Sequence, residues 1–548
     1  MNAVLASFEQ VRNSFPEIPE TIVEALDRTA ARYATEEAVV EGGSRVTFGK
    51  LKKQADQVAS ALAAKGFKEG DHIGVCVGNG VEWIELFAGI VRLGAVCVPI
   101  NTRLKPDEIA YQLKQADVAA LFITERLLSI DFIEVLRLIC PEVDTSLPSP
   151  KLPRLRQVIV LGNSAPNACQ TLDDFFSDGG QDEMPPPPEP DDPALIQYTS
   201  GTTSFPKGVV LTHRNMVTDA YFAGQCIGVQ AGDRYLSARP FFHVAGSTLS
   251  VVLSLVTGAT LVTMKRFIAD EALRLLEDER CTLTSGNDTM YLMLLNSPDF
   301  APGCYRLRGG WAAVSPSIMR RITGEFDAGE TVVAYGLSEA SPNVAMSDHQ
   351  DPLEDRVAGW MNVHPGLQVR ITDPENGVQC AIDEEGEIQV QGWCVMQGYY
   401  NDPEATAKTM TADGFLRTGD KGTMRKDLKL RFVGRLKEII RVGGENVAPS
   451  DIEDALVEHP KIQQAQVFAL PDPRLIEVPG AYVLLRQGET LTEDDVAEWA
   501  KCRLANFKIP KYIAIVESFE SIGMTASSKI PKRLLAEHAK KLFGLEDS

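Results

Sequence analysis

Short β-rich runs alternate with helical stretches through the first third of the chain, and this alternation limits the possible folds more than any other feature. The β-rich runs are HIGVCVG, AVCVPI, VAALFIT and QVIVLG, at residues 72–78, 95–100, 118–124 and 157–162. A helical stretch, VEWIELFAGIVRLG at residues 81–94, separates the first two runs. Strands that alternate with helices in this way are typical of layered α/β domains. We therefore expect an α/β fold.

The length of the chain and a change of character near residue 434 indicate two domains. With 548 residues the chain exceeds what one hydrophobic core usually organises. After residue 434 a Gly-Gly turn is followed by an amphipathic helix, which we expect Ser450 to open. We therefore expect a large multi-layer N-terminal domain over residues 1–434 and a small α+β C-terminal domain over residues 435–548.

Charge and cysteine usage exclude several classes of protein. A net charge of −21 argues against nucleic-acid and anionic-membrane partners, because phosphate binding requires clustered Lys and Arg. The ten cysteines form no C-x-x-C pair and the seven histidines are dispersed, so we expect neither a zinc site nor a disulfide framework. A cytoplasmic location fits this pattern, and the N-terminal segment lacks the basic start and apolar run of a signal peptide.

Residues 244–264 contain no charged side chain and are about as long as a bilayer span. Gly258 and several Ser and Thr residues interrupt this stretch. Gly258 also separates a helix-like half from the strand-like ATLVTM at residues 259–264. We therefore expect a buried helix followed by a buried strand, and no transmembrane segment.

The segment YTSGTTSFPKG at residues 198–208 has the composition of a phosphate-binding loop. Small residues let backbone N–H groups and hydroxyls approach phosphate oxygens, and Lys207 adds a positive charge. The segment is not a Walker A loop, because Pro206 precedes the lysine and Gly208 follows it, where that motif has a magnesium-binding hydroxyl. Taken alone, such a loop is also typical of a simple turn.

Eight ordered segments, spanning roughly residues 20–540, together resemble the adenylate-forming superfamily of acyl-CoA synthetases, peptide-synthetase adenylation domains and firefly-type luciferases. They are YTSGTTSFPKGV (198–209), PFFHVAG (240–246), GWAAVS (310–315), AYGLSEA (334–340), GEIQVQG (386–392), LRTGD (416–420), GRLKEIIRVGGENVAPSDIE (434–453) and SSKIPK (527–532). The resemblance implies that a substrate carboxylate attacks the α-phosphorus of ATP, giving acyl-AMP and pyrophosphate. It also implies that the small C-terminal domain is mobile and rotates before CoA reacts.

The resemblance assigns an ATP site and a metal site to matching positions. The implied ATP-binding residues are Thr199, Ser200, Gly201, Thr202, Thr203, Lys207, Ala312, Ala313, Tyr335, Gly336, Ser338, Asp420 and Arg435. Tyr335 is expected to stack on adenine, and Asp420 to accept hydrogen bonds from both ribose hydroxyls. Thr199 and Glu339 are expected to bind Mg²⁺, which takes only one or two carboxylates. The alternatives are a solvated surface acid for Glu339 and a capping residue for Asp420.

Catalytic roles are implied for Lys529, His243 and Glu339. Lys529 matches a lysine that reaches the α-phosphate and the substrate carboxylate during adenylation, and His243 matches a neighbour of that carboxylate. For the second step, Lys437 matches the hinge between the domains. The matching CoA-binding residues are Gly443, Gly444 and Glu445, for which the alternative is a simple turn.

The acyl pocket is where the chain departs most from the family pattern. Its implied residues are His243, Val244, Gly286, Trp311 and Ala334. The departures are Ser204, Asp288, Trp311 and Ser528, which stand where a glycine, a proline, a small residue and a glycine are common. An indole beside the pocket favours a compact, cyclic or aromatic acid over a long straight chain.

The leading hypothesis is therefore an ATP- and Mg²⁺-dependent acid:CoA ligase, because the sequence continues only briefly after Lys529 and shows no carrier domain. The alternative is a stand-alone adenylation enzyme that loads an acid onto a carrier protein, with Asp288 as a candidate partner for a substrate ammonium. A luciferase-like oxygenase has no specific support. An inactive binding protein is disfavoured, because Lys529, Glu339 and Asp420 are all present. A homodimer is compatible with the sequence.

Overall fold

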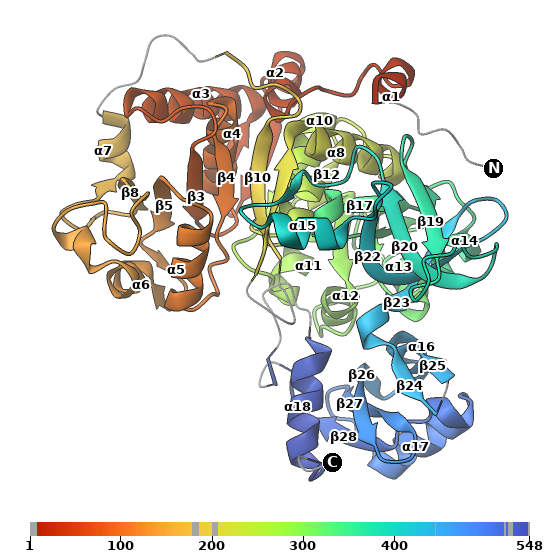
Figure 1. The fold of residues 1–548 in the computed structure, drawn as a ribbon. Coiled ribbons are helices and arrows are strands. Elements are labelled where there is room, and N and C mark those ends of the chain that lie inside the picture. Colours follow the sequence, from red (N-terminus) through yellow and green to blue (C-terminus); the bar gives the residue numbers. More distant parts are fainter. Residues whose placement is uncertain are drawn as a thin grey trace.

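The chain folds into a large body that carries the N-terminus and a smaller body that carries the C-terminal end (Figure 1). The structure is a computed structural model that describes residues 8–177, 186–199, 206–443, 445–519, 522–523 and 530–545. Among these residues, sheets of nine, eight and four strands belong to the large body, and a sheet of five strands belongs to the small one.

The eight-stranded sheet has the order β21-β11-β10-β4-β3-β5-β8-β9. Its strands are β3 (His72–Cys76), β4 (Val96–Pro99), β5 (Ala120–Thr124), β8 (Gln157–Leu161), β9 (Gln170–Thr171), β10 (Pro193–Tyr198), β11 (Gly208–Thr212) and β21 (Gly398–Tyr399). The four predicted β-rich runs form β3, β4, β5 and β8, which run parallel. The predicted α/β layering is therefore confirmed.

The nine-stranded sheet has the order β18-β17-β16-β15-β14-β12-β13-β1-β2. Its strands are β1 (Glu37–Glu41), β2 (Ser44–Thr47), β12 (Arg234–Leu236), β13 (Thr260–Thr263), β14 (Leu283–Asn287), β15 (Gly309–Ala313), β16 (Glu330–Gly336), β17 (Asn343–Met346) and β18 (Asn362–Val363). Strands β12 to β16 run parallel, so their carboxyl ends lie along one edge of the sheet.

Helices of the large body pack on these sheets through close backbone contacts and aromatic rings. They are α1 (Phe8–Ser14), α2 (Ile22–Arg32), α3 (Phe48–Ala64), α4 (Val81–Arg92), α5 (Pro106–Gln115), α6 (Phe132–Ile139), α7 (Leu172–Ser177), α8 (His213–Ile227), α11 (Ala269–Asp278), α12 (Asp288–Leu295), α13 (Pro316–Glu325), α14 (Leu353–Val357) and α15 (Pro403–Thr409). A Cβ at Gly89 would lie 2.4 Å from the Cβ of Val58, so glycine lets α3 and α4 approach. The Trp83 ring of α4 lies 5.3 Å from the Phe241 ring, which ties this helix to the segment before His243.

The uncharged stretch from residue 244 forms a buried helix and then a buried strand, as predicted. The helix consists of α9 (Val244–Gly246), a π-helical segment (Ser247–Val252) and α10 (Leu253–Thr257). Gly258 ends it with a left-handed φ of 79°, and β13 follows. No helix within the described ranges is both long enough and apolar enough to cross a membrane.

A four-stranded sheet precedes the small body, with the strands β19 (Gln368–Thr372), β20 (Glu385–Gln391), β22 (Leu416–Met424) and β23 (Leu430–Arg435). The small body contains β24 (Ile440–Val442), β25 (Glu445–Val447), β26 (Ile462–Asp472), β27 (Ile476–Leu485), β28 (Tyr512–Val516), α16 (Pro449–Val457), α17 (Glu493–Lys501) and α18 (Lys532–Leu542). Separate apolar clusters join its sheet to α16 and α17 and to α18. The predicted fold class, a large α/β domain followed by a smaller α+β domain, is confirmed.

Helix α16 begins at Pro449, one residue before the predicted Ser450. Proline suits the first helical position, because its φ is already helical and the N–H that it lacks would have no partner there. Ser450 lies in the first turn, and its hydroxyl donates to the Val433 carbonyl oxygen of β23 at 3.5 Å. The serine therefore joins the small body to the last strand of the large one.

Two carboxyl groups come together where the small body meets the large one. Asp288 in the first turn of α12 accepts a hydrogen bond from the Ser315 N–H at 2.8 Å. Asp454 of α16 hydrogen bonds the Ser315 side chain, and the two carboxylates repel each other. Burial, more than this repulsion, raises the pKa of Asp454 to about 7 and that of Asp288 to about 6. Gln464 Nε2 donates across the same junction to Thr289 Oγ1 at 3.3 Å.

We predict that this contact between the two bodies is more stable at about pH 5.5 than at about pH 8. A raised carboxyl pKa means that the contact favours the protonated form, so it loses stability as the pH rises from about 4 to about 7. Asp454→Asn should remove most of this dependence. The measurement is the rate of limited proteolysis between residues 435 and 449, corrected for the pH dependence of the protease. Asp451→Asn on the same helix is the control, and equal wild-type rates at both pH values would contradict the prediction.

Candidate active site

The predicted acyl and adenine residues lie side by side at the carboxyl ends of parallel strands. The strand register places Gly286 of β14 beside Ala312 of β15, and Ala312 beside Val333 of β16. Ala334 follows directly on β16, whereas Ala313 is the exposed last residue of β15. Ligands of open α/β sheets bind outside the carboxyl ends of the strands. The predicted residues therefore lie at the edge where such sheets bind ligands.

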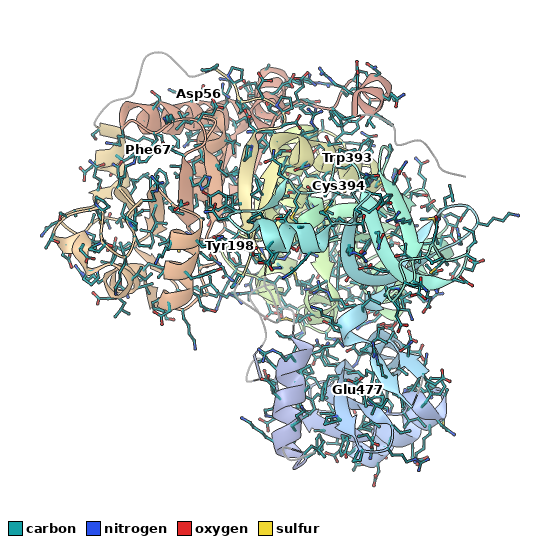
Figure 2. All side chains as sticks on the ribbon, viewed as in Figure 1. Asp56, Phe67, Tyr198, Trp393, Cys394 and Glu477 are labelled. Carbon is teal, nitrogen blue, oxygen red and sulfur yellow. The ribbon has the colours of Figure 1, made fainter. Side chains whose placement is uncertain are left out.

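The predicted phosphate loop has two fixed ends. Tyr198, labelled in Figure 2, ends β10, and its register partner Gly208 begins the antiparallel strand β11. The Thr199 N–H donates to the Lys207 carbonyl oxygen at 3.0 Å, which closes the loop at its base. The predicted ligands Ser200, Gly201, Thr202 and Thr203, and the departure Ser204, lie outside the described residues.

Tyr399 connects the predicted metal ligand with the lysine of the predicted phosphate loop. Its hydroxyl donates to Glu339 Oε1 at 2.8 Å, and the Lys207 ammonium lies 4.6 Å from the centre of its ring. Burial and the Glu339 carboxylate raise the pKa of Tyr399, so the phenol remains a hydrogen-bond donor at neutral pH. The sequence analysis missed Tyr399, because only the pairing of β21 with β11 brings it to the loop.

Main-chain contacts hold the turn that carries Ser338 and Glu339. These two residues begin a 3-10 helix (Ser338–Ala340), and the Met396 N–H donates to the Glu339 carbonyl oxygen at 3.0 Å. A Cβ at Gly336 would lie 1.6 Å from the Pro342 carbonyl oxygen, so only glycine allows this close return of the chain. The half-buried Glu339 carboxylate therefore has a defined position at the end of β16.

Asp420 is a buried carboxylate with few protein partners. It accepts a hydrogen bond from the Tyr335 hydroxyl at 3.0 Å, and Arg435 Nε lies 3.7 Å from its Oδ1. Burial raises the pKa of Asp420 to about 6, although Arg435 and the bond from Tyr335 act in the opposite direction. Asp420 is 5% exposed, whereas the Arg435 side chain is 54% exposed. A buried carboxylate in this position can accept further hydrogen bonds from a ligand.

The ring of Tyr335 is already stacked on an aromatic side chain. Its centroid lies 5.3 Å from that of Phe432, with an interplanar angle of 20°. Phe432 of β23 is 41% exposed, whereas Tyr335 is 5% exposed. Phe432 therefore covers one face of the Tyr335 ring. Stacking of adenine on this aromatic pair stays a prediction. The sequence offered one unused signal, a large aromatic residue between Arg431 and Val433.

The predicted acyl-pocket residues differ in their exposure. His243 is half-buried and caps α9, and its Nδ1 accepts a hydrogen bond from the Ala245 N–H at 3.3 Å. Val244 and Trp311 are almost fully buried, and the Trp311 Nε1–H donates to the Tyr235 hydroxyl at 2.9 Å. The indole therefore has a fixed orientation on β15. The contact between His243 and a substrate carboxylate stays a prediction.

The predicted hinge and CoA residues lie on exposed backbone beyond β23. Lys437 belongs to a short 3-10 turn (Leu436–Glu438). Gly443 lies in the turn between β24 and β25, and Glu445 is the first residue of β25. Gly443 has a left-handed φ of 58°, as such a turn requires. Gly444, Ser528 and Lys529 lie outside the described residues. The described part of this segment is a hairpin turn, and its role in CoA binding stays a prediction.

The described groups suit a phosphorylated, hydroxyl-bearing ligand. Lys207 offers a positive charge, Asp420 offers acceptors in a water-poor position, and Glu339 and Thr199 offer hard oxygen ligands. Across the described ranges, no three His, Cys, Asp or Glu side chains form a metal cluster. Mg²⁺ fits the remaining donors, because it keeps several waters and needs only one or two carboxylates.

Family models match most of the chain. The model described as AMP-binding enzyme matches residues 26–400, and the model described as AMP-binding enzyme C-terminal domain matches residues 451–529. The chain is similar to the putative acyl-CoA synthetase YngI of Bacillus subtilis (strain 168), with 32% identity over 97% of this chain and 99% of that protein. It is also similar to the mitochondrial medium-chain acyl-CoA ligase ACSF2 of Rattus norvegicus, with 32% identity over 96% of this chain and 88% of the relative.

Solved structures show the same fold. The anthranilate CoA ligase AuaEII in complex with anthranoyl-AMP aligns with a TM-score of 0.86 at 23% identity, over 97% of this chain and 99% of that one. ATP-bound MatB from Rhodopseudomonas palustris aligns with a TM-score of 0.81 at 25% identity, over 95% of this chain and 99% of that one. Both alignments include the large and the small body.

We predict that Asp420→Asn stabilises the free protein above pH 6. The raised pKa makes ionisation of the native carboxyl unfavourable, so wild-type stability falls as the pH rises from about 4 to about 6, while the variant has no such loss. The difference should reach about 3 kcal/mol at pH 8. The measurement is the unfolding midpoint at pH 5 and pH 8, with the exposed Asp278→Asn as control. A lower midpoint for Asp420→Asn at pH 8 would contradict the prediction.

Proposed function

The chain belongs to the AMP-binding enzyme family of adenylate-forming acyl-CoA synthetases, and from this membership we propose that it is an ATP-dependent acid:CoA ligase. It activates a carboxylic acid as acyl-AMP with release of pyrophosphate, and then transfers the acyl group to the thiol of CoA. The observation that carries the proposal is the match of nearly the whole chain to proteins named acyl-CoA synthetase or ligase.

In the first step a carboxylate oxygen of the acid attacks the α-phosphorus of ATP, and the bond to pyrophosphate breaks. Lys207 and the loop that it ends bind the β- and γ-phosphates and stabilise the leaving pyrophosphate. Asp420 accepts hydrogen bonds from the ribose hydroxyls, and its burial keeps water from competing for them. Lys529 of the small domain reaches the reacting carboxylate and the α-phosphate, and His243 orients the acid.

We also propose that Glu339 and Thr199 hold Mg²⁺. When bound, it neutralises negative charge on the phosphate oxygens. Tyr399 supports this site, because its hydrogen bond of 2.8 Å fixes Oε1 of Glu339 and does not occupy Oε2. Its ring also contacts the Lys207 ammonium, so one side chain positions both the metal ligand and the phosphate-binding cation.

In the second step the CoA thiol attacks the acyl carbonyl carbon, and the bond to AMP breaks. We infer that the small domain rotates about Lys437 between the steps, so that Gly443, Gly444 and Glu445 replace Lys529 at the reaction centre. The exposed position of Lys437 between two sheets supports this hinge. The polar junction of Asp288, Ser315 and Asp454 supports a contact that can separate, because among the described residues the apolar clusters of the small domain include no residue of the large one.

CoA is favoured over a carrier protein as the acyl acceptor. Relatives that match almost the full chain are named as acyl-CoA synthetases or ligases, and the carrier-protein alternative has no comparable support. The test is thioester formation from ATP, an acid and free CoA, compared with a phosphopantetheinyl carrier protein at equal concentration. Transfer to the carrier alone would overturn the choice of CoA.

The proposal includes a cytoplasmic location and a homodimer. All ten cysteines are free thiols in the structure, which suits a reducing compartment. Localisation of a tagged full-length chain and light scattering of the purified protein test the two statements.

We predict that Tyr399→Phe raises the Mg²⁺ concentration required for half-maximal adenylation by about 10-fold. Phenylalanine keeps the ring beside Lys207 and loses only the hydrogen bond to Glu339, so saturating Mg²⁺ should restore most of the rate. The measurement is acid-dependent ATP–pyrophosphate exchange as a function of Mg²⁺. Tyr111→Phe, which removes a hydroxyl bonded to the Pro206 carbonyl oxygen, is the control. An unchanged Mg²⁺ dependence would contradict the positioning role of Tyr399.

We predict that two substitutions separate the half-reactions. Lys529→Ala should abolish ATP–pyrophosphate exchange and largely preserve thioester formation from preformed acyl-AMP, because only the first step needs this ammonium. Lys437→Pro should spare exchange and impair thioester formation, because it restricts the hinge. Lys541→Ala, on the exposed face of α18, is the control. Normal exchange in Lys529→Ala, or equal loss of both steps in Lys437→Pro, would contradict the assignments.

A further inference from the structure

Arg239 is a half-buried cation with no anionic partner among the described residues. It follows β12, and its guanidinium carbon lies 4.0 Å from the centre of the Trp311 ring. Its Nε and Nη2 atoms are sealed from solvent and have no hydrogen-bond partner among the described residues. Burial lowers the pKa of Arg239 to about 10, so the side chain is still charged at neutral pH.

The groups around this guanidinium are aromatic and neutral. The charged or titratable side chains that act on it in the described part of the chain are the phenols of Tyr235 and Tyr291. The Tyr235 hydroxyl donates to Ser285 Oγ at 2.7 Å, and the Tyr291 hydroxyl is buried without a partner. Two polar groups in one cluster therefore lack partners, and the described residues supply no counterion.

The backbone that carries Arg239 is held firmly. Asn79 Nδ2 donates to the Arg239 carbonyl oxygen at 2.8 Å, and the Phe241 N–H donates to Asn79 Oδ1 at 2.9 Å. The aromatic contact of Trp83 with Phe241 fixes the same segment from the other side. The position of Arg239 is thus fixed by packed neighbours, and it does not belong to a loose surface chain.

This cation lies within the proposed acyl pocket. Trp311 is one of the predicted pocket residues, and His243 follows Arg239 by four positions. Tyr291 packs on Gly286, where a Cβ would lie 2.8 Å from the tyrosine ring. The guanidinium therefore lies among residues that the family resemblance assigns to binding of the acid.

The two unpaired nitrogens are the pair that binds a carboxylate side-on. Elsewhere in this chain, Arg214 donates through Nε and Nη2 to the two oxygens of Asp191 at 2.6 and 2.7 Å. Such bidentate pairs are among the strong hydrogen bonds of proteins. A buried guanidinium without such a partner is costly, so a ligand carboxylate would offset a large penalty.

We propose that Arg239 binds a second carboxylate of the acid, so that the preferred substrates are short dicarboxylic acids. One carboxylate is adenylated, and the other forms a bidentate pair with Nε and Nη2 of Arg239. Trp311 closes the pocket behind the guanidinium and limits the distance between the two carboxylates. This inference rests on the proposed ligase function and names the class of its acid.

The first test compares acids of equal length in pyrophosphate release, with butyric against succinic acid and hexanoic against adipic acid. The wild-type protein should prefer a diacid in at least one pair. Arg239→Met should lower kcat/KM for that diacid by about 100-fold and affect the monoacid much less. Arg239→Lys should restore little, because an ammonium cannot make the side-on pair. Arg306→Met, an exposed arginine beyond α12, is the control.

The second test measures unfolding midpoints without ATP. Arg239→Met should raise the midpoint of the free protein, because it replaces an unpaired buried charge with an apolar chain of similar length. Succinate or adipate should raise the midpoint of the wild-type protein and not that of the variant. A merely structural arginine would give a lower midpoint and no difference between the two acids.

The outcomes separate the inference from the function on which it rests. A wild-type preference for the monoacid in both pairs, with no diacid effect on the midpoint, would overturn the dicarboxylate assignment and leave the ligase function standing. Equal losses for both acids in Arg239→Met would also overturn it, because the arginine would then serve the reacting carboxylate. No pyrophosphate release with any acid would count against the ligase function itself. If Arg239→Met does not fold, the wild-type preference and the wild-type midpoint shift still decide the question.

Discussion

Parallel hydrogen bonding between β12, β14, β15 and β16 is the constraint on which the site depends. Because these strands run in one direction, their carboxyl ends bring residues from four distant segments to a single edge. The register pairs Gly286 with Ala312 and Ala312 with Val333, the residue before Ala334. The loops that leave this edge carry no regular main-chain pairing of their own, so they can turn backbone and side-chain groups toward a ligand.

Two charged side chains near this edge are incompletely paired among the described residues. Asp420 is buried with a raised pKa, and Arg239 has two enclosed nitrogens without a partner in the described part of the chain. Each costs stability in the free protein, and each gains a partner in the proposed complex, from the ribose and from the acid. The large apolar cluster of the core offsets this loss of stability. Binding energy therefore comes from groups that the fold holds in place before the ligand arrives.

The small domain has a hydrophobic core of its own. Its two apolar clusters lie on the two faces of its own sheet, so it is held together independently of the large domain. Its junction with the large domain is polar and contains Asp288 and Asp454 close together. A self-contained domain with a polar contact can change its position without exposing a core. This property suits a reaction in which one domain must present two different groups to one site.

The sequence by itself determined the α/β layering, the two domains and the adenylate-forming signatures, because hydrophobic periodicity and short motifs are local properties of the chain. It also located the strand after Gly258, since a left-handed glycine at the end of a helix is a local requirement. Only the tertiary structure decided the partners of these motifs. Tyr399, Phe432 and Arg239 lie outside the motifs. Sheet pairing brings Tyr399 and Phe432 to the site from distant segments, and packing places Arg239 against Trp311. Burial decided the rest, because the same carboxylate or guanidinium is an ordinary surface charge in water and a ligand-binding group once the fold has removed its solvent.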